Sequence, residues 1–270
     1  MYIDTHCHLY FDRFDQDLEE VLKRASDGDV GRILVPGIDQ HTSDLAVDLA
    51  ERYESIYAGV GVHPNSALSW TDETPDHFRR LAVHERVVAV GEIGLDYYWD
   101  SAPKEVQHQV FFNQLELAAE YELPVVIHVR DRDQERAPAL CDVLNILREW
   151  ISGLEQTNSP LAAHPGVLHS YSGNLELAQE AYRLGMNIGV TGPVTFKNAD
   201  QLREVVVNMP LKVLLTETDA PFLTPHPFRG KRNEPAYVKY VTDEIARLRC
   251  EEAAFVKEQI EKNAQRLFHW

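Results

Sequence analysis

The sequence contains few cysteines and no long apolar run. Cys7, Cys141 and Cys250 are far apart and lack the paired spacing of a cysteine-based metal module or a disulfide framework. No apolar run approaches the roughly 18 residues that a membrane-spanning helix needs, and Met1 leads into a predicted strand rather than a secretory signal sequence. We therefore expect a cytoplasmic protein with reduced thiols and no membrane partner, and nothing in the sequence indicates an obligate protein partner.

Basic residues are also scarce, because 26 lysines and arginines stand against 43 acidic residues and the formal net charge is −17. A chain this acidic repels a polyanion at long range, which excludes a protein that coats duplex nucleic acid non-specifically. A phosphate-bearing substrate would have to be held locally, by bound divalent metal ions and a small cluster of basic side chains.

What the sequence does contain is a regular alternation of apolar strands and amphipathic helices along its 270 residues. Eight strands are predicted, over residues 1–8, 32–36, 57–62, 87–93, 124–129, 167–170, 186–190 and 212–216. Helices are predicted over residues 14–26, 44–53, 74–85, 104–121, 136–151, 175–184, 199–207, 236–249 and 251–268. Such alternation requires a parallel sheet, and eight units in about 250 residues match an α/β protein of the (β/α)8 TIM barrel type.

An open, doubly wound sheet would show the same alternation, so the alternation alone does not distinguish the two folds. The positions of the polar residues do. Nearly every predicted strand ends in a His, Asp or Glu, and a barrel gathers all eight strand ends around one pocket. We therefore predict a single barrel domain over residues 1–270. Residues 153–166 resemble a linker, but the strand after them still ends in a polar residue, so we interpret them as an excursion within a loop.

The first predicted strand carries Asp4, His6 and His8 at alternate positions. Alternate side chains of a strand share a face, so these three are expected to converge. Neutral imidazole suits divalent transition metals, and an added carboxylate suits zinc, manganese or magnesium. One strand supplies too few ligands, and the others must come from elsewhere in the chain.

Four further strand ends supply candidate ligands: Glu92, His128, His169 and Asp219. One carboxylate can bridge two metal ions about 3.5–4 Å apart, a spacing that suits displacement at phosphorus. Taken singly, each histidine could be a hydrogen-bonded structural residue, and residues 217–219 could be a surface turn. Together with His6 and His8, these four residues favour a shared site for two divalent ions, with Asp219 as the group that accepts the proton of the attacking water. The remaining histidines are predicted to be solvated: His41, His77, His84, His108, His164, His226 and His269.

Candidate contacts to substrate follow three of the predicted strands. His63 precedes Pro64 and could donate a hydrogen bond to a substrate oxygen, or simply form a turn. Arg130 lies two residues after His128 and could bind a phosphate or form a plain salt bridge. The basic run 229–235 follows the eighth strand, where a barrel places its catalytic loops, and guanidinium groups match phosphate oxygens. We favour a phosphate-binding loop over an ordinary solvated one.

With these residues in place, the sequence resembles, almost from end to end, the TatD family of metal-dependent deoxyribonucleases, within the amidohydrolase-like group of (β/α)8 barrels. The motifs that carry the resemblance are Asp4-Thr5-His6-Cys7-His8-Leu9, Gly61-Val62-His63-Pro64, Gly91-Glu92-Ile93-Gly94-Leu95-Asp96-Tyr97-Tyr98, Ile127-His128 with Arg130, His169 with Ser172-Gly173, Glu217-Thr218-Asp219-Ala220-Pro221 and Arg229-Gly230-Lys231-Arg232-Asn233-Glu234-Pro235. Two departures from the family pattern concern the length of residues 153–166 and the residues around His169, and both bear on loop shape and substrate preference.

The resemblance implies a metal-dependent hydrolase with two metal ions, which could be Mg²⁺, Mn²⁺ or Zn²⁺. One ion is expected on His6, His8, Glu92 and Asp219, and the second on Glu92, His128 and His169. His63 and the basic run, with Arg229, Lys231, Arg232 and Asn233, are expected to face substrate phosphate. Glu92 stands where several related amidohydrolases carry a carbamylated lysine, which favours the nuclease branch.

The leading hypothesis is therefore a phosphodiester hydrolase, a 3′ to 5′ exonuclease on single-stranded or frayed DNA ends, with RNA as a second candidate substrate. Its catalytic residues would be Asp219, Glu92 and His63. One alternative is an amidohydrolase or esterase that cleaves a small C–N or C–O substrate. Another is a catalytically silent metal-binding protein.

Overall fold

Eight parallel strands follow one another around a nearly closed barrel in the computed structural model, which describes residues 1–133 and 135–270. They are β1 (Tyr2–Asp4), β2 (Val30–Pro36), β3 (Ile56–Val60), β4 (Val87–Asp96), β5 (Val125–Arg130), β6 (Gly166–Leu168), β7 (Asn187–Val190) and β8 (Leu214–Thr216). Each pairs in parallel with the next. Beside β1, Thr5 donates its backbone N–H to the carbonyl of Thr216 at 3.0 Å. The predicted (β/α)8 TIM barrel is confirmed.

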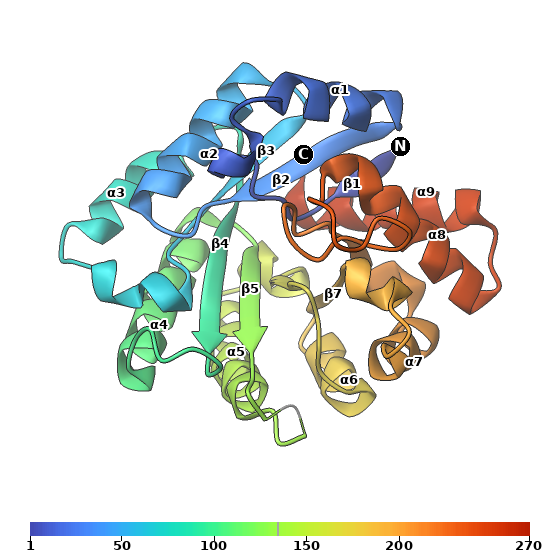
Figure 1. The fold of residues 1–270 in the computed structure, drawn as a ribbon. Helices are drawn as coiled ribbons and strands as arrows, with labels where there is room; N and C mark the ends of the chain where they lie inside the picture. The colour runs from blue at the N-terminus through green and yellow to red at the C-terminus, as the bar shows by residue number, and fades with distance from the viewer. Residues whose placement is uncertain (134) are drawn as a thin grey trace.

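Helices surround the barrel, as Figure 1 shows. They are α1 (Leu18–Asp27), α2 (Gln40–Arg52), α3 (Thr74–Ala82), α4 (Lys104–Tyr121), α5 (Pro138–Gln156), α6 (Leu175–Arg183), α7 (Asp200–Asn208), α8 (Val238–Arg249) and α9 (Ala253–Phe268). Their apolar faces pack on the outside of the sheet, as parallel sheets require, because each βαβ crossover lays a helix over the strands. Of the described helices, none is both long enough and apolar enough to cross a membrane.

Several predicted boundaries differ from the observed ones. The first strand ends at Asp4 rather than His8, and β6 ends at Leu168, before the predicted residue 170. Residues 211–213 form a 3-10 turn instead of the start of β8. At β1 and β6 the polar residues that continue the sequence pattern belong to the loop after the strand, where side chains of the site lie.

The stretch 153–166 is mostly helical rather than a loop. Helix α5 continues to Gln156, and a short 3-10 helix, η3 (Pro160–Ala163), follows it. This connection enters β6 at its amino end, so it lies at the opposite end of the barrel from the carboxyl ends of the strands. Its length therefore does not shape the pocket at the strand ends.

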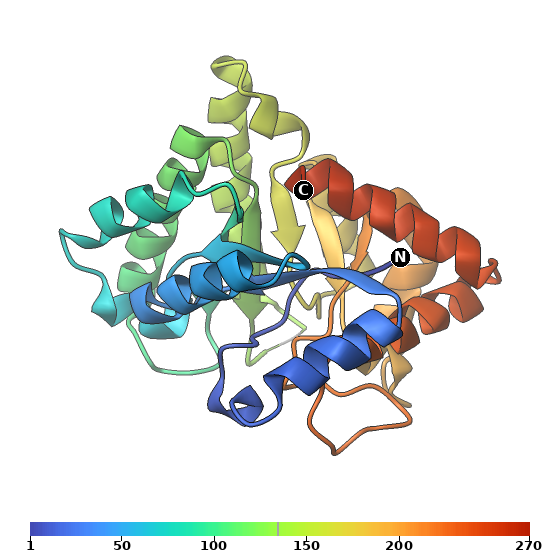
Figure 2. The ribbon, with the colours of Figure 1, turned by 90° about the horizontal axis from the view of Figure 1, so that it is seen from above.

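The carboxyl terminus closes the amino end of the barrel. Ile3, Leu34, Val126 and other interior residues of the strands form a buried cluster with Leu267 and Phe268 of α9, and Trp270 packs against it. In Figure 2 the terminus marked C lies beside the starting ends of the yellow and orange strands, away from their arrowheads. The open end of the barrel is therefore the one where the carboxyl ends of the strands meet.

Candidate metal centre

The six predicted metal ligands all lie in the carboxyl-terminal halves of strands or just beyond the strand ends. They come from the segment after β1, from β4, from β5 and from the segments after β6 and β8: His6, His8, Glu92, His128, His169 and Asp219. All except His6 line a cavity of about 1300 Å³, which opens at this end of the barrel. Burying so many ionisable groups is costly unless they are paired or bound to a cation.

One group of ligand atoms has the dimensions of a metal site. Nε2 of His6 and Nε2 of His8 lie 3.1 Å apart, and Oε2 of Glu92 lies 3.3 Å from the first and 3.6 Å from the second. Oδ1 of Asp219 is 3.4 Å from Nε2 of His8 and 4.0 Å from Nε2 of His6. Atoms bound to one divalent ion lie about 3.0–3.4 Å apart. The four residues fit a single ion with modest adjustment.

Hydrogen bonding shows which nitrogen of His8 is available to a metal. The hydroxyl of Tyr10 donates to the carbonyl of Pro36 at 2.9 Å and lies 2.7 Å from Nδ1 of His8. Because the hydroxyl proton is already used, Nδ1 must carry a proton and donate it. Nε2 of the neutral ring then has a free lone pair, and it is the nitrogen that faces Glu92 and Asp219.

His6 is also suited to ligation. Burial and the nearby His169 lower its pKa to about 4, so its ring is neutral at physiological pH. Among the residues that the structure describes, its buried Nδ1 has no hydrogen-bond partner, while Nε2 lies 3.3 Å from Oε2 of Glu92. Burial alone would raise the pKa of Asp219, but the imidazoles of His8 and His169 lower it, so the fourth group is a carboxylate.

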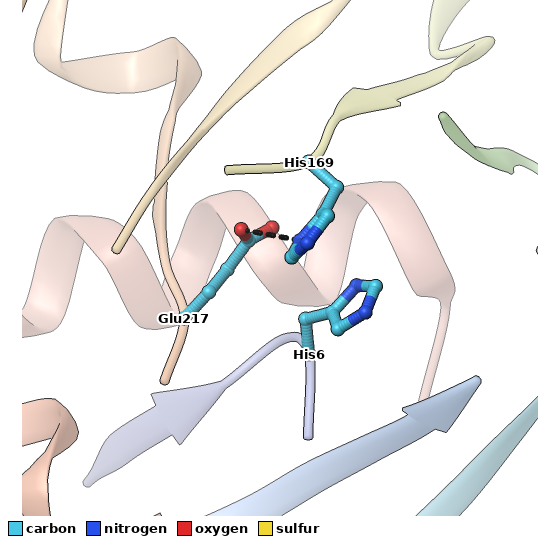
Figure 3. A group of neighbouring side chains, drawn as sticks. All are labelled: His6, His169 and Glu217. Atoms are coloured by element: carbon cyan, nitrogen blue, oxygen red, sulfur yellow. Dashed lines mark hydrogen bonds and ion pairs between the residues drawn. The ribbon is translucent and has the colours of Figure 1, made fainter. Parts of the chain in front are cut away.

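His169 is oriented by Glu217, a residue for which the sequence alone allowed a surface turn. Nδ1 of His169 lies 2.8 Å from Oε2 of Glu217, which also accepts the backbone N–H of Ser170 at 2.8 Å. Figure 3 shows this contact and the ring of His6 beside it. The two rings stack with centroids 3.4 Å apart. Because a carboxylate only accepts, Glu217 holds the Nδ1 proton of His169, and Nε2, 3.9 Å from Oδ1 of Asp219, is the nitrogen that can bind a metal once it has lost its own proton.

The position of Glu217 could have been found from the sequence. Glu217 and Asp219 alternate as His6 and His8 do, which indicates a second strand end with two functional residues. The pairing has an electrostatic effect as well. Burial lowers the pKa of His169, but the carboxylate of Glu217 outweighs burial and raises that pKa to about 9.

A second group lies on the other side of Glu92. Oε1 of Glu92 is 2.8 Å from Nδ1 of His128 and 3.7 Å from Nε2 of His63, whereas Oε2 of Glu92 faces His6 and His8. Burial would raise the pKa of Glu92, but the surrounding imidazoles of His6, His63 and His128 hold it well below its usual range. Glu92 is therefore an ionised carboxylate with one oxygen toward each group, the arrangement of a bridging ligand.

His63 differs from the other imidazoles in its protonation. Its Nδ1 accepts the backbone N–H of Asn65 at 3.1 Å, so in the neutral ring Nε2 carries the proton. Burial and the neighbouring His128 lower its pKa to about 3, which keeps the ring neutral. A protonated Nε2 is a hydrogen-bond donor rather than a ligand, and it faces the cavity.

The second predicted ligand set is gathered only in part. His128 contacts Glu92, but His169 lies with Glu217, His6 and Asp219 on the far side of the first group. His128 has a further partner that the sequence analysis did not assign, Oδ2 of Asp96 at 3.2 Å from Nε2. Burial lowers the pKa of His128, but hydrogen bonds to Asp96 and Glu92 raise it overall.

Asp4 does not join the other two polar residues of its segment, contrary to the expectation from strand alternation. Its carboxylate is fully buried and accepts the hydroxyl of Thr218 at 2.6 Å and the backbone N–H of Thr218 at 2.8 Å. Burial raises its pKa to about 8. The strand ends at Asp4, so alternation no longer aligns it with His6 and His8; it supports the segment after β8 instead.

The basic run after β8 is divided between the cavity and the fold. Arg229 lines the cavity. Arg232 instead forms two hydrogen bonds of 2.7 Å with the carboxylate of Asp17 at the start of α1. Asn233 is buried and donates to the carbonyls of Thr218 and Phe222 at 2.8 and 2.6 Å, and Lys231 lies over the ring of Phe228.

The other predicted substrate contacts remain at the cavity. Arg130, at the end of β5, lines it together with His63. The seven histidines predicted to be solvated are exposed or half-buried, as expected. One of them, His226, also lines the cavity.

A (β/α)8 barrel whose strand ends gather imidazoles and carboxylates around a large open cavity defines a metal-dependent hydrolase. Comparison with known proteins agrees with that class. The model of the family described as TatD related DNase matches residues 3–269, and the chain belongs to this family.

Individual relatives cover the whole chain. It is 46% identical over 99% of both chains to an uncharacterized metal-dependent hydrolase, YabD, of Bacillus subtilis. It is 35% identical, over 98% of this chain and 97% of the other, to the Cronobacter sakazakii protein named 3′-5′ ssDNA/RNA exonuclease TatD. The crystal structure of the TatD homologue YJJV of Escherichia coli superposes with a TM-score of 0.89 at 33% identity, covering 100% and 98% of the two chains.

Proposed function

We propose that this protein is a phosphodiester hydrolase that removes nucleotides from the 3′ end of single-stranded or frayed DNA, with RNA ends as a second substrate. The observation that carries the proposal is the position of Glu92, whose two carboxylate oxygens face two separate groups of imidazoles at the base of a cavity with cationic side chains in its wall. The names of the more distant relatives as 3′-5′ exonucleases support it.

The donor atoms suit two divalent ions, and magnesium, manganese and zinc all remain candidates. His6, His8, Glu92 and Asp219 would hold one, and Glu92 and His128 would contribute to the other. His169 would reach that second ion only by moving from its present position beside His6 and Asp219. Bound there, the ions would supply acidity to a water molecule and positive charge to the phosphoryl oxygens. The free lone pair on Nε2 of His8 supports this assignment, and Nε2 of His169 could bind once it has lost its proton, because Glu217 holds the Nδ1–H.

The side chains around the ions have separate tasks in this proposal. His63 donates a hydrogen bond from Nε2–H to a phosphoryl oxygen as negative charge develops there. Asp219, ionised because its pKa is lowered, accepts a proton from the attacking water. Arg130 and Arg229 bind flanking phosphates, since both line the cavity.

The remaining residues of the basic run mainly hold the loop after β8 in place. Arg232 and Asn233 hold the segment that carries Arg229 against α1 and the loop after β8. The exposed Lys231 stays a predicted phosphate contact. We propose that residues 1–270 act as one catalytic unit, and its cytoplasmic location stays a prediction from the sequence.

The test is release of mononucleotides from single-stranded oligonucleotides labelled at the 3′ or the 5′ end, with chelator or with added Mg²⁺, Mn²⁺ or Zn²⁺. We expect metal-dependent loss of the 3′ label first, followed by stepwise shortening. Hydrolysis of lactones or amides in place of oligonucleotides would contradict the proposal and favour the amidohydrolase alternative.

A further inference from the structure

Two clusters of aromatic and cationic side chains lie at the cavity, and neither the metal centre nor the proposed chemistry uses their rings. The first, which we name the Arg130 platform, consists of Tyr98, Trp99 and Arg130. The guanidinium of Arg130 lies 4.3 Å from the ring centroid of Tyr98 and 5.7 Å from that of Trp99. The second, the Arg229 platform, consists of Phe196, His226 and Arg229, with the guanidinium 4.3 Å from the centroid of Phe196.

The Arg130 platform is exposed and yet held in place. Trp99 is 50% exposed, a large fraction for an indole. Oδ1 of Asp96 accepts the backbone N–H groups of Tyr98 and Trp99 at 2.8 and 3.1 Å, and Oδ2 of the same carboxylate faces His128. The segment that carries the rings is therefore tied to the metal centre by one side chain, which fixes its distance from the ligands.

The Arg229 platform joins two loops. Phe196 follows β7, and His226 and Arg229 follow β8. The rings of Phe196 and His226 meet edge to face with centroids 5.8 Å apart, and the backbone N–H of His226 donates to the hydroxyl of Thr195 at 2.9 Å. Tyr98, Arg130, Phe196, His226 and Arg229 all line the same cavity.

The two platforms lie on opposite halves of the barrel. One belongs to the ends of β4 and β5 and the other to the loops after β7 and β8, while β8 lies beside β1. The imidazoles and carboxylates of the metal centre come from strand ends in both halves and so lie between them. The cavity of about 1300 Å³ exceeds what a single small ligand requires, roughly 300–1,000 Å³.

We propose that the two platforms are base-stacking subsites for an unpaired oligonucleotide, each taking one base, with the phosphodiester that joins the two nucleotides over the metal centre. The inference deepens the proposed function and rests on it. Aromatic rings and guanidinium planes both stack on bases, and their cations also attract the backbone of a polyanion that the acidic chain otherwise repels. Two successive bases must turn to opposite sides of the cavity, which a duplex cannot do.

The test measures oligonucleotide binding apart from turnover. The variants are Tyr98→Ala and Phe196→Ala, whose side chains line the cavity, and the matched control is Phe112→Ala, an aromatic residue on α4 that is 50% exposed and is not among the described residues that line the cavity. Fluorescence anisotropy of a labelled thymidine oligonucleotide is recorded with full-length protein in chelator, and again with Mg²⁺ on phosphorothioate linkages that slow cleavage.

We expect each platform variant to weaken binding about tenfold, because each loses the stacking of one base, and the control to bind as wild type. Removing the base from the last or the penultimate nucleotide should weaken binding to wild type similarly. Removing a given base should weaken binding no further in the variant that already lacks the ring on which this base stacks. The variant that shows no further loss therefore identifies the platform that takes that base.

Wild-type affinity in both platform variants, or equal binding of the intact and base-free oligonucleotides, would overturn the inference. If nucleotides are released normally in that case, the exonuclease proposal still stands. If base-dependent binding is lost in the variants but no oligonucleotide is cleaved with any metal, the subsites are supported and the exonuclease proposal fails.

Discussion

Nδ1 of His169 lies 2.8 Å from the buried carboxylate of Glu217, and the ring it orients stacks on His6. This contact fixes which nitrogen of His169 can reach a metal. A carboxylate that holds a ligating imidazole typically changes metal affinity by about 10–100-fold when it is removed.

Replacing Glu217 by Ala should therefore weaken metal binding by about 10–100-fold, because Nδ1–H of His169 and the N–H of Ser170 lose their acceptor. Isothermal titration of the metal-free protein with Mn²⁺ measures the change. Glu217→Gln keeps an acceptor oxygen and should lose less affinity. Unchanged affinity in Glu217→Ala would show that Glu217 does not orient a ligand.

Replacing Glu92 by Ala should abolish turnover and remove the second metal ion. The residue has one oxygen toward His6 and His8 and the other toward His128, so its loss separates the two groups. Metal content after dialysis and nucleotide release are measured on the same sample. Wild-type activity in this variant would rule out the two-metal scheme.

Replacing His63 by Ala should lower kcat/KM for an oligonucleotide by about 10²–10³-fold, the usual effect of removing one donor to a developing oxyanion. Metal content should be unchanged, because Nε2 of His63 carries a proton and is not free to ligate. Loss of a metal ion from His63→Ala would instead make His63 a ligand and contradict the assignment of its protonated nitrogen.

Replacing Phe268 by Ala should lower the free energy of unfolding by about 3–5 kcal/mol, because a buried aromatic leaves a cavity. Phe268 is 3% exposed, in the cluster that closes the amino end of the barrel. Phe255→Ala is the control on the same helix. Phe255 is 53% exposed, so its replacement should change the free energy of unfolding little. Urea unfolding followed by circular dichroism compares the two, and equal midpoints would mean that the terminus does not stabilise the barrel.

The barrel and the six candidate ligands could be predicted because both depend on local patterns. Apolar strands alternating with amphipathic helices define the order of elements, and parallel strands place their carboxyl ends together. Residues such as Glu92 and His128, at the ends of neighbouring strands, then meet without any knowledge of the loops.

Contacts between residues far apart in the chain could not be predicted from the sequence. Arg232 and Arg229 are three residues apart in one basic run, yet Arg232 pairs with Asp17 while Arg229 lines the cavity. The direction of each side chain depends on which distant element lies beside the loop. No periodicity encodes that information.

The amino-acid sequence was enough to predict the order of strands and helices, the chemical type of the candidate site and most of the residues that the fold gathers there. Only the tertiary structure decided that Asp4 supports Thr218 instead of joining the ligands, that Glu217 orients His169, and which nitrogens of His8 and His63 carry protons. The reason is physical: the strand pattern comes from local backbone geometry and burial, whereas the protonation and orientation of a side chain depend on hydrogen-bond partners that folding brings from distant parts of the chain.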